Sequence, residues 1–175
     1  MDINDSNIRP SVICCEELKT KNEIILGELE IVDGINSQSH KRKYVRGLFF
    51  EANKTIGVSG NEYDIRKMKL AVDEYRCNKI FNGNAYGEMI TDGVMLNRKN
   101  LNLNRCCIHV DDVILIDNKM YGVAEILDNE LGRSIYSKCE SGKYKITIFP
   151  RIFVNSVSSD IKICAFDVGT IEHKN

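Results

Sequence analysis

The chain has 175 residues, a formal net charge of −1 and no tryptophan. This length favours a single domain with a core of its own, and the near-neutral charge disfavours general binding to nucleic acid or to an acidic membrane surface. No apolar run reaches the roughly 20 residues that span a bilayer. The seven cysteines include no CxxC pair, which predicts free, buried or half-buried thiols in a reducing compartment and no metal or redox motif.

The first third of the chain predicts an arm followed by strands. Residues 1–20 are polar and lack periodicity, so we expect an N-terminal arm ahead of one domain over residues 21–175. β-forming residues predict a strand over 23–32, interrupted near Gly27, and a second strand over 44–52. Residues 34–43 end in the basic cluster of His40, Lys41, Arg42 and Lys43. This cluster indicates either an anionic contact site or a solvated loop, and the solvated loop is the simpler interpretation.

The middle of the chain predicts a helix, a long excursion and a hairpin. Asp64 can cap a helix through about residue 77, whose apolar face recurs at helical spacing and is typical of core packing. Residues 81–100 contain three glycines and many turn formers, so we expect a surface excursion. Strands over 106–116 and 120–127 follow, joined by a hairpin-like turn.

A second helix leads into the last strands. Asp128 is the expected N-cap, and Leu131, Ile135 and Cys139 form one apolar stripe. Gly142 can end the helix, and strands over 144–153 and 160–168 complete the chain. Many strands with two helices in this order predict an α+β fold, mainly an antiparallel β-sheet or small β-barrel with two or more flanking helices.

From about Tyr44 to Val168, the order of motifs resembles the prohead core protease family of tailed bacteriophages, which shares the fold of herpesvirus assemblin. The family has an NxNGRxYP-like loop, matched here by VSGNEYD with Tyr63 at the tyrosine position. A family helix of the form LxxxVxxY is matched by Met68, Val72 and Tyr75. The first half of the GELxHP motif is matched by residues 87–90, GEMI.

The later family motifs are matched in the same order. The family's LD-x-x-x-G segment, which opens a helix, is similar to Leu127, Asp128 and Gly132, and Gly142 follows. The family's next strand carries its nucleophilic serine in a VSSRG-like motif. Here that strand reads KITIFPRIF, with Arg151 in a position to keep the arginine. The resemblance therefore implies the prohead protease and assemblin fold.

The catalytic residues of the family are not matched. Thr91 stands where the motif has its histidine base, and Asp92 stands in place of the proline. A threonine hydroxyl is too weakly basic to act as a general base near neutral pH. The nucleophile position falls at about Ile148 or Phe149, neither of which can attack a peptide bond. The resemblance thus implies a degenerate member that lacks the catalytic serine and histidine.

Two residues remain as candidates for catalysis. Thr147 is the hydroxyl nearest the lost serine position, and His109 lies near a second histidine often found in the family, with Asp111 available to orient it. The alternative is a His109 satisfied by local hydrogen bonds on its strand. Asp111 and Asp112 are neighbours on a strand, so we expect them to point to opposite faces. No histidines or cysteines have metal-ligand spacing, and no cofactor is expected.

The resemblance implies a catalytically inactive structural protein of a tailed-phage virion, made in the bacterial host cytoplasm. Its expected partners are capsid or other head or tail proteins, and possibly a second copy of itself. The arm and the excursion over 81–100 are the expected contact surfaces. One alternative is an active prohead maturation protease with a non-standard catalytic group. Another is a binding module that regulates an active protease or a host factor.

Overall fold

The computed structural model describes residues 24–52, 64–91 and 96–173. The expected arm over 1–20 and Tyr63 lie outside these residues. The described elements, in chain order, are β1 (Glu30–Ile35), β2 (Lys41–Glu51), α1 (Ile65–Tyr75), the π-helical turn η1 (Arg76–Ile80), β3 (Tyr86–Glu88), the 3₁₀ turn η2 (Leu103–Arg105), β4 (Cys106–Ile116), β5 (Lys119–Ile126), α2 (Glu130–Glu140), β6 (Tyr144–Val154) and β7 (Ile161–Glu172).

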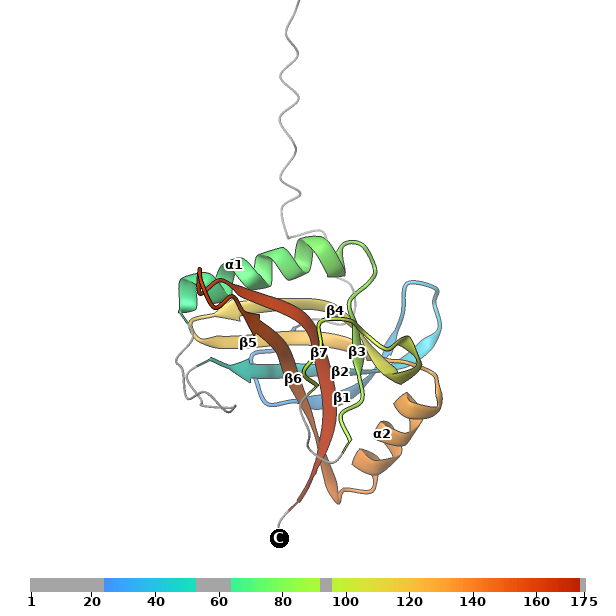
Figure 1. Ribbon diagram of the computed structural model, residues 1–175. Helices are drawn as coiled ribbons and strands as arrows, with labels where there is room; N and C mark the ends of the chain where they lie inside the picture. The colour runs from blue at the N-terminus through green and yellow to red at the C-terminus, as the bar shows by residue number, and fades with distance from the viewer. Residues whose placement is uncertain (1–23, 53–63, 92–95, 174–175) are drawn as a thin grey trace, which may run out of the picture.

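The strands form two sheets that pack against each other (Figure 1). One sheet has the order β1-β2-β5-β4-β3, and every pairing within it is antiparallel. The other is the antiparallel hairpin of β6 and β7. The sheets meet where Met89, just after β3, forms a parallel bridge with Val168 of β7. The predicted α+β class is confirmed. Of the two predicted architectures, antiparallel sheet and small barrel, the sheet is observed, since the described strands do not close into a barrel.

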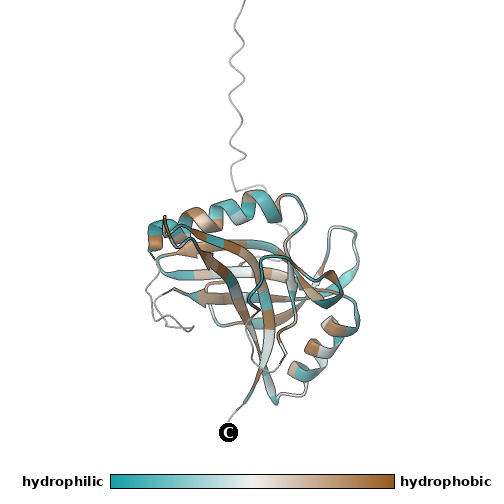
Figure 2. Cartoon of the chain, in the orientation of Figure 1, coloured by the Kyte–Doolittle hydropathy of each residue, from teal (hydrophilic) through white to brown (hydrophobic). Residues whose placement is uncertain are grey.

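The helices cover the edges of this arrangement. Asp64 caps α1 as predicted, since its carboxylate accepts the amide hydrogen of Arg66 at 2.8 Å. The buried face of α1 packs on β7, where the Tyr75 ring meets the Phe166 ring edge-on at 5.1 Å. Figure 2 shows the alternation that produces this packing, with hydrophilic residues along the outer faces of both helices. The 3.6-residue period therefore identified the core side of α1 correctly.

Several predicted boundaries are wrong. The strand expected over 23–32 is observed only from Glu30, after a bend at residues 26–28 that agrees with the predicted interruption near Gly27. The expected loop over 34–43 is a short turn between β1 and β2. Asn36 tightens this turn, because its side-chain oxygen accepts the amide hydrogen of His40 at 2.9 Å. Three residues of the basic cluster, Lys41, Arg42 and Lys43, therefore lie on β2, where Lys43 pairs with Asp33 at 2.6 Å. The cross-strand partners of these residues determine that they form a strand, and the composition of the segment does not reveal those partners.

Two other sequence expectations are also corrected. The N-cap of α2 is Asn129, whose side-chain oxygen accepts the amide hydrogen of Gly132 at 2.8 Å. Asp128 instead forms an exposed ion pair with Arg133. Cys77 is exposed, whereas the other cysteines among the described residues are buried or half-buried free thiols. The apolar stripe of α2 and the stop at Gly142, with φ of 73°, are confirmed.

The segment over 81–100 is partly internal and not a surface excursion as expected. It contributes β3, in which Gly87 and Glu88 are both buried. A Cβ atom on Gly87 would lie only 1.8 Å from the carbonyl oxygen of Phe166. Glycine is therefore required here, because the backbone of β3 passes directly over the backbone of β7.

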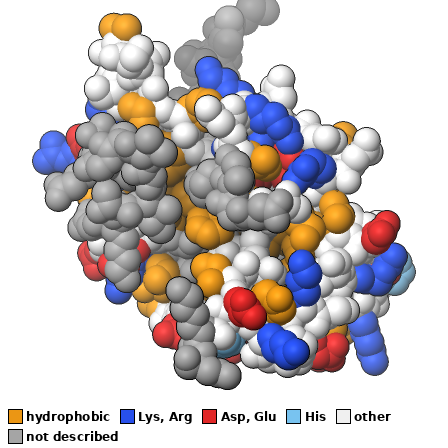
Figure 3. Space-filling view, turned by 60° about the horizontal axis from the view of Figure 1, so that its bottom comes forward, with side chains coloured by type: hydrophobic (Ala, Val, Ile, Leu, Met, Phe, Trp, Pro, Cys, Tyr) orange, Lys and Arg blue, Asp and Glu red, His pale blue; other side chains and the backbone are white. Residues whose placement is uncertain are grey.

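No helix among the described residues is long and apolar enough to cross a bilayer. On the face that Figure 3 turns forward, apolar side chains and charges of both signs are interspersed. This distribution agrees with the near-neutral charge of the chain and offers no single-sign surface for a polyanion.

We expect Gly87→Ala to lower the free energy of unfolding by about 1–3 kcal/mol, because the added methyl group forces β3 away from β7. Urea denaturation at neutral pH measures this. Gly27→Ala is the matched control, since the nearest atom to its added methyl would be 3.9 Å away. Equal stabilities of the two variants would contradict the required close approach.

Candidate functional site

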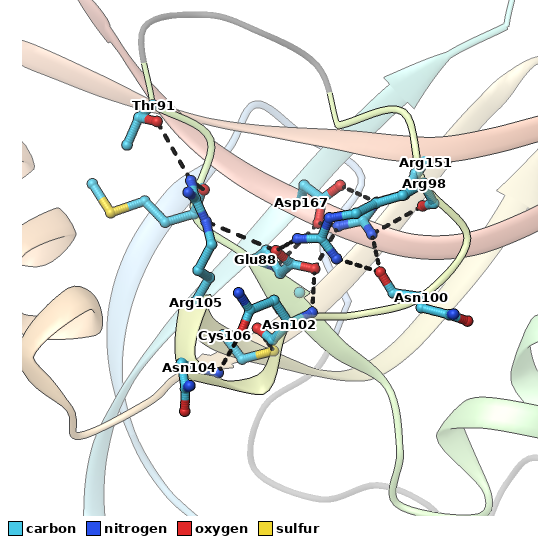
Figure 4. Close-up of polar contacts among 12 residues, drawn as sticks. Glu88, Thr91, Arg98, Asn100, Asn102, Asn104, Arg105, Cys106, Arg151 and Asp167 are labelled. Carbon is cyan, nitrogen blue, oxygen red and sulfur yellow. Dashed lines mark hydrogen bonds and ion pairs between the residues drawn. The ribbon is translucent and has the colours of Figure 1, made fainter.

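The most unusual feature of the interior is a buried ionic network, drawn in Figure 4. Arg151 of β6 forms two hydrogen bonds with Asp167 of β7, from Nε to Oδ2 at 2.8 Å and from Nη2 to Oδ1 at 2.7 Å. The same Nη2 atom also donates to Oε1 of Glu88 at 3.1 Å. The exposed fractions of these side chains are 2%, 3% and 0% for Arg151, Asp167 and Glu88. The network therefore joins both sheets at their junction.

The strand register explains why these groups meet. Arg151 is opposite Ala165 in the hairpin, so Asp167 is its diagonal neighbour, within reach of a long side chain. Asp167 also accepts the amide hydrogen of Glu88 at 3.0 Å, which fixes the end of β3. One carboxylate thus serves both the arginine of β6 and the backbone of β3.

Residues just beyond β3 complete the network. Glu88 accepts the amide hydrogen of Asn102 at 2.8 Å and a hydrogen bond from the Arg98 guanidinium. Arg151 Nη1 donates to the carbonyl oxygens of Arg98 and Asn100, each at 3.2 Å. The buried groups therefore hold the described residues 98–102 against the sheet junction, as Figure 4 shows.

The electrostatics favour the charged forms of Glu88 and Arg151. Burial by itself would raise the pKa of Glu88, but hydrogen bonds from Asn102, Arg98 and Arg151 outweigh it and hold the pKa below its usual value. Burial likewise opposes the charge of Arg151 and would lower its pKa, but the hydrogen bonds to Asp167 and Glu88 outweigh burial and raise the pKa above its usual value. Charge-assisted, bidentate pairing is the arrangement that makes such burial tolerable.

Arg105 connects the network to Thr91, at the position where the family resemblance led us to expect a histidine. Its Nη2 atom donates to the carbonyl oxygen of Met89 at 3.0 Å and lies 3.4 Å from the Thr91 hydroxyl oxygen. Its Nε atom is 3.9 Å from Glu88 Oε2. Thr91 is exposed. The guanidinium of Arg105 therefore lies beside Thr91, between it and the Glu88 carboxylate.

The nucleophile position faces the interior. Ile148 is buried in the core, with its neighbours Ile146 and Pro150 on the same face of β6. Thr147 and Phe149 point the other way, toward Gly169 and Ile90. A Cβ atom on Gly169 would lie 3.4 Å from the Thr147 hydroxyl oxygen, 3.6 Å from the Phe149 ring and 3.8 Å from Ile90 Cβ. The Thr147 hydroxyl oxygen is buried and has no hydrogen-bond partner among the described residues.

His109 lies on β4 of the larger sheet, and its contacts are local. Its Nδ1 atom is 3.3 Å from Asp111 Oδ1, and its ring packs edge-on against Tyr86 at 5.0 Å. The hydrogen bond to Asp111 raises the pKa of His109, although burial opposes this. Asp112 turns away to Arg76, at 2.9 Å, as expected for neighbouring strand residues. Thr147 and His109 thus stand on different sheets, and their pairing remains a prediction.

Sequence reasoning missed Asp167, Arg98 and Arg105. A signal for Asp167 was present, since it is a single charge in the apolar run ICAFDVG of the last strand. Arg151 is the corresponding single cation in IFPRIF of the preceding strand. Opposite charges isolated in two consecutive apolar strands of a hairpin indicate a buried pair. Among the described residues, no three His, Cys, Asp or Glu side chains are grouped as metal ligands.

The fold of two antiparallel sheets with flanking helices is similar to that of a phage capsid assembly protease. The solved structure that carries this conclusion is the bacteriophage T4 capsid assembly protease, gp21. It matches with a TM-score of 0.59 and 18% identity, over 80% of this chain and 90% of that one. No protein-family model matches the chain, and no curated protein matches it either. The chain therefore has a prohead protease-like fold.

Breaking the network should be strongly destabilising. We expect Arg151→Ala to lower the free energy of unfolding by about 3–5 kcal/mol, because two buried carboxylates lose their common partner. Urea denaturation provides the measurement. The control is Arg133→Ala, which breaks the exposed pair with Asp128 and should cost less than about 1 kcal/mol. Similar losses in both variants would mean that the network is not a principal stabilising element.

The network should also make stability depend on pH in the acid range. The folded pKa of Glu88 is lowered, so its contribution is complete above its unfolded pKa of about 4.3 and is lost as the pH falls through the folded pKa. We expect Glu88→Gln to reduce stability at pH 7 and to show a smaller further loss between pH 5 and pH 3 than wild type. Urea denaturation across this range tests it, and parallel curves would contradict it.

Proposed function

We propose that this chain is a protease-fold protein of a tailed-phage head that binds other head proteins and does not cleave peptide bonds. The observation that carries the proposal is that the protease-like fold is present while the expected catalytic positions hold residues that cannot act as nucleophile or base. Gly87 and Glu88 of β3 are buried together with Arg151, while Ile148 and Thr91 stand where the nucleophile and base are expected. The guanidinium of Arg105 beside Thr91 further opposes the presence of a proton acceptor there.

The fold supports the association with the phage head. The similar solved structure is that of a capsid assembly protease, and 90% of it is matched. A protein that keeps this fold and has lost its chemistry can still act through the surfaces that recognise head proteins. We therefore place the protein with capsid or other virion proteins as partners, in the assembled particle.

One observation favours a second function, an active maturation protease with Thr147 as nucleophile. A buried hydroxyl without a partner is costly, and such groups are concentrated at functional sites. Thr147 lies one residue from the expected serine position, next to Ile90. It would need a base, and His109 with Asp111 is the available imidazole–carboxylate pair.

The deciding experiment incubates the purified chain with the scaffold and capsid proteins of its phage and maps new N-termini by mass spectrometry. We expect no cleavage, and a stoichiometric copy of the chain in purified mature particles. Specific cleavage by wild type that is lost in Thr147→Ala and in His109→Ala would replace our proposal with the second function. Presence only in infected-cell lysate, and not in particles, would contradict the structural role.

A further inference from the structure

The two sheets are connected on one side and open on the other. On the connected side, β3 reaches β7 through the Met89–Val168 bridge, and the amide of Ile90 donates to the Val168 carbonyl oxygen at 2.8 Å. On the other side, β1 ends the larger sheet and β6 ends the smaller one. The outer edges of β1 and β6 pair with no strand among the described residues. We call the gap between them the open seam.

The open seam contains a groove of about 450 Å³. Its walls include the consecutive residues 31–33 of β1 and 144–146 of β6, with Tyr136 and Cys139 of α2 alongside. Successive side chains of a strand point to opposite faces. A groove lined by consecutive residues therefore follows the strand edges and not a sheet face, so it exposes unpaired backbone N–H and C=O groups on both sides.

Such a groove fits an extended segment. Unpaired strand edges accept another strand through main-chain hydrogen bonds, and alternate side chains then find pockets on either face. The apolar part of the lining comes from Leu29, Ile31, Cys139 and Ile146. The charged part of the lining is mixed, with the acidic side chains of Glu28, Asp33 and Glu140 and the basic side chains of Lys43 and Lys145, of which Lys43 is paired with Asp33. The fitting segment is therefore short, apolar and β-forming, without a requirement for net charge.

We propose that Val12–Cys15 of this same chain occupies the open seam as an added strand. Residues 1–23 lie outside the described part of the chain and lead into Ile24, four residues before Glu28, which lines the groove. Within these 23 residues, the longest apolar run is VICC at 12–15, and it begins with two β-branched residues. Four residues of strand span about 13 Å, and the twelve residues 16–27 suffice to return the chain to β1.

The added strand would pair with β1 on one side and with β6 on the other, and so join the two sheets across the open seam. It gives the N-terminal segment a binding site within its own chain, where the sequence alone suggested contact with other virion proteins. The proposal is independent of the function proposed above, because it concerns the closure of the fold and not the chemistry of the site.

Hydrogen–deuterium exchange on the full-length chain tests the proposal. The variant is Val12→Asp/Ile13→Asp, and the matched control is Ile3→Asp/Ile8→Asp, which adds the same charges outside the VICC run. We expect amides within residues 30–33 and 144–146 to exchange at least tenfold faster in the variant than in wild type and in the control. Amides of β4 and β5 should exchange equally in all three proteins, which verifies that each is folded.

Two results would overturn the proposal. Equally fast exchange of the β1 and β6 edges in wild type and variant would mean that the seam is open. Protection that the variant does not remove, and that rises with protein concentration, would assign the seam to a second copy of the chain. Light scattering on the same samples separates these two results.

Discussion

The structure depends on the buried pairing of Arg151 with two carboxylates from separate elements. An isolated guanidinium in this position would be prohibitively costly, so Asp167 and Glu88 must both be present and correctly oriented. Because Asp167 is on the adjacent strand of the hairpin while Glu88 is on the other sheet, the network links the sheets to each other. It also specifies the register of β3 on β7, which hydrophobic contact alone would specify weakly.

The close crossing of β3 over β7 follows from the same constraint. Gly87 allows the two backbones to approach, and the amide of the next residue then reaches the Asp167 carboxylate. The segment over 98–102 is held from the other side by carbonyl oxygens that accept from Arg151. Gly87 and Glu88 are thus part of a hydrogen-bonded structural junction between the two sheets. Any catalytic group at this site would have to act without using Glu88, Arg151 or Asp167, which are already bonded to one another.

The arrangement also separates the two candidates for catalysis. Thr147 faces the junction of β6, β7 and the residue after β3, whereas His109 lies on the larger sheet beside Asp111 and Tyr86. The local contacts of His109 are those of a strand histidine satisfied by its neighbours. The Thr147 hydroxyl oxygen and the Nε atom of Arg105 are the buried polar atoms of this site that have no hydrogen-bond partner among the described residues.

The sequence by itself determined the α+β class, the cap and core face of α1, the β4–β5 hairpin and the glycine stop after α2. Each of these depends on local spacing or on backbone conformation, which neighbouring residues control. Only the tertiary structure decided that Glu88 is internal, that three residues of the basic cluster lie on a strand, and that Asp167 completes the network. These outcomes depend on partners far along the chain, such as Arg151 for Glu88 and Asp33 for Lys43. A charge in a sequence is assigned to solvent by default, and only a partner brought to it by the fold allows it to be buried.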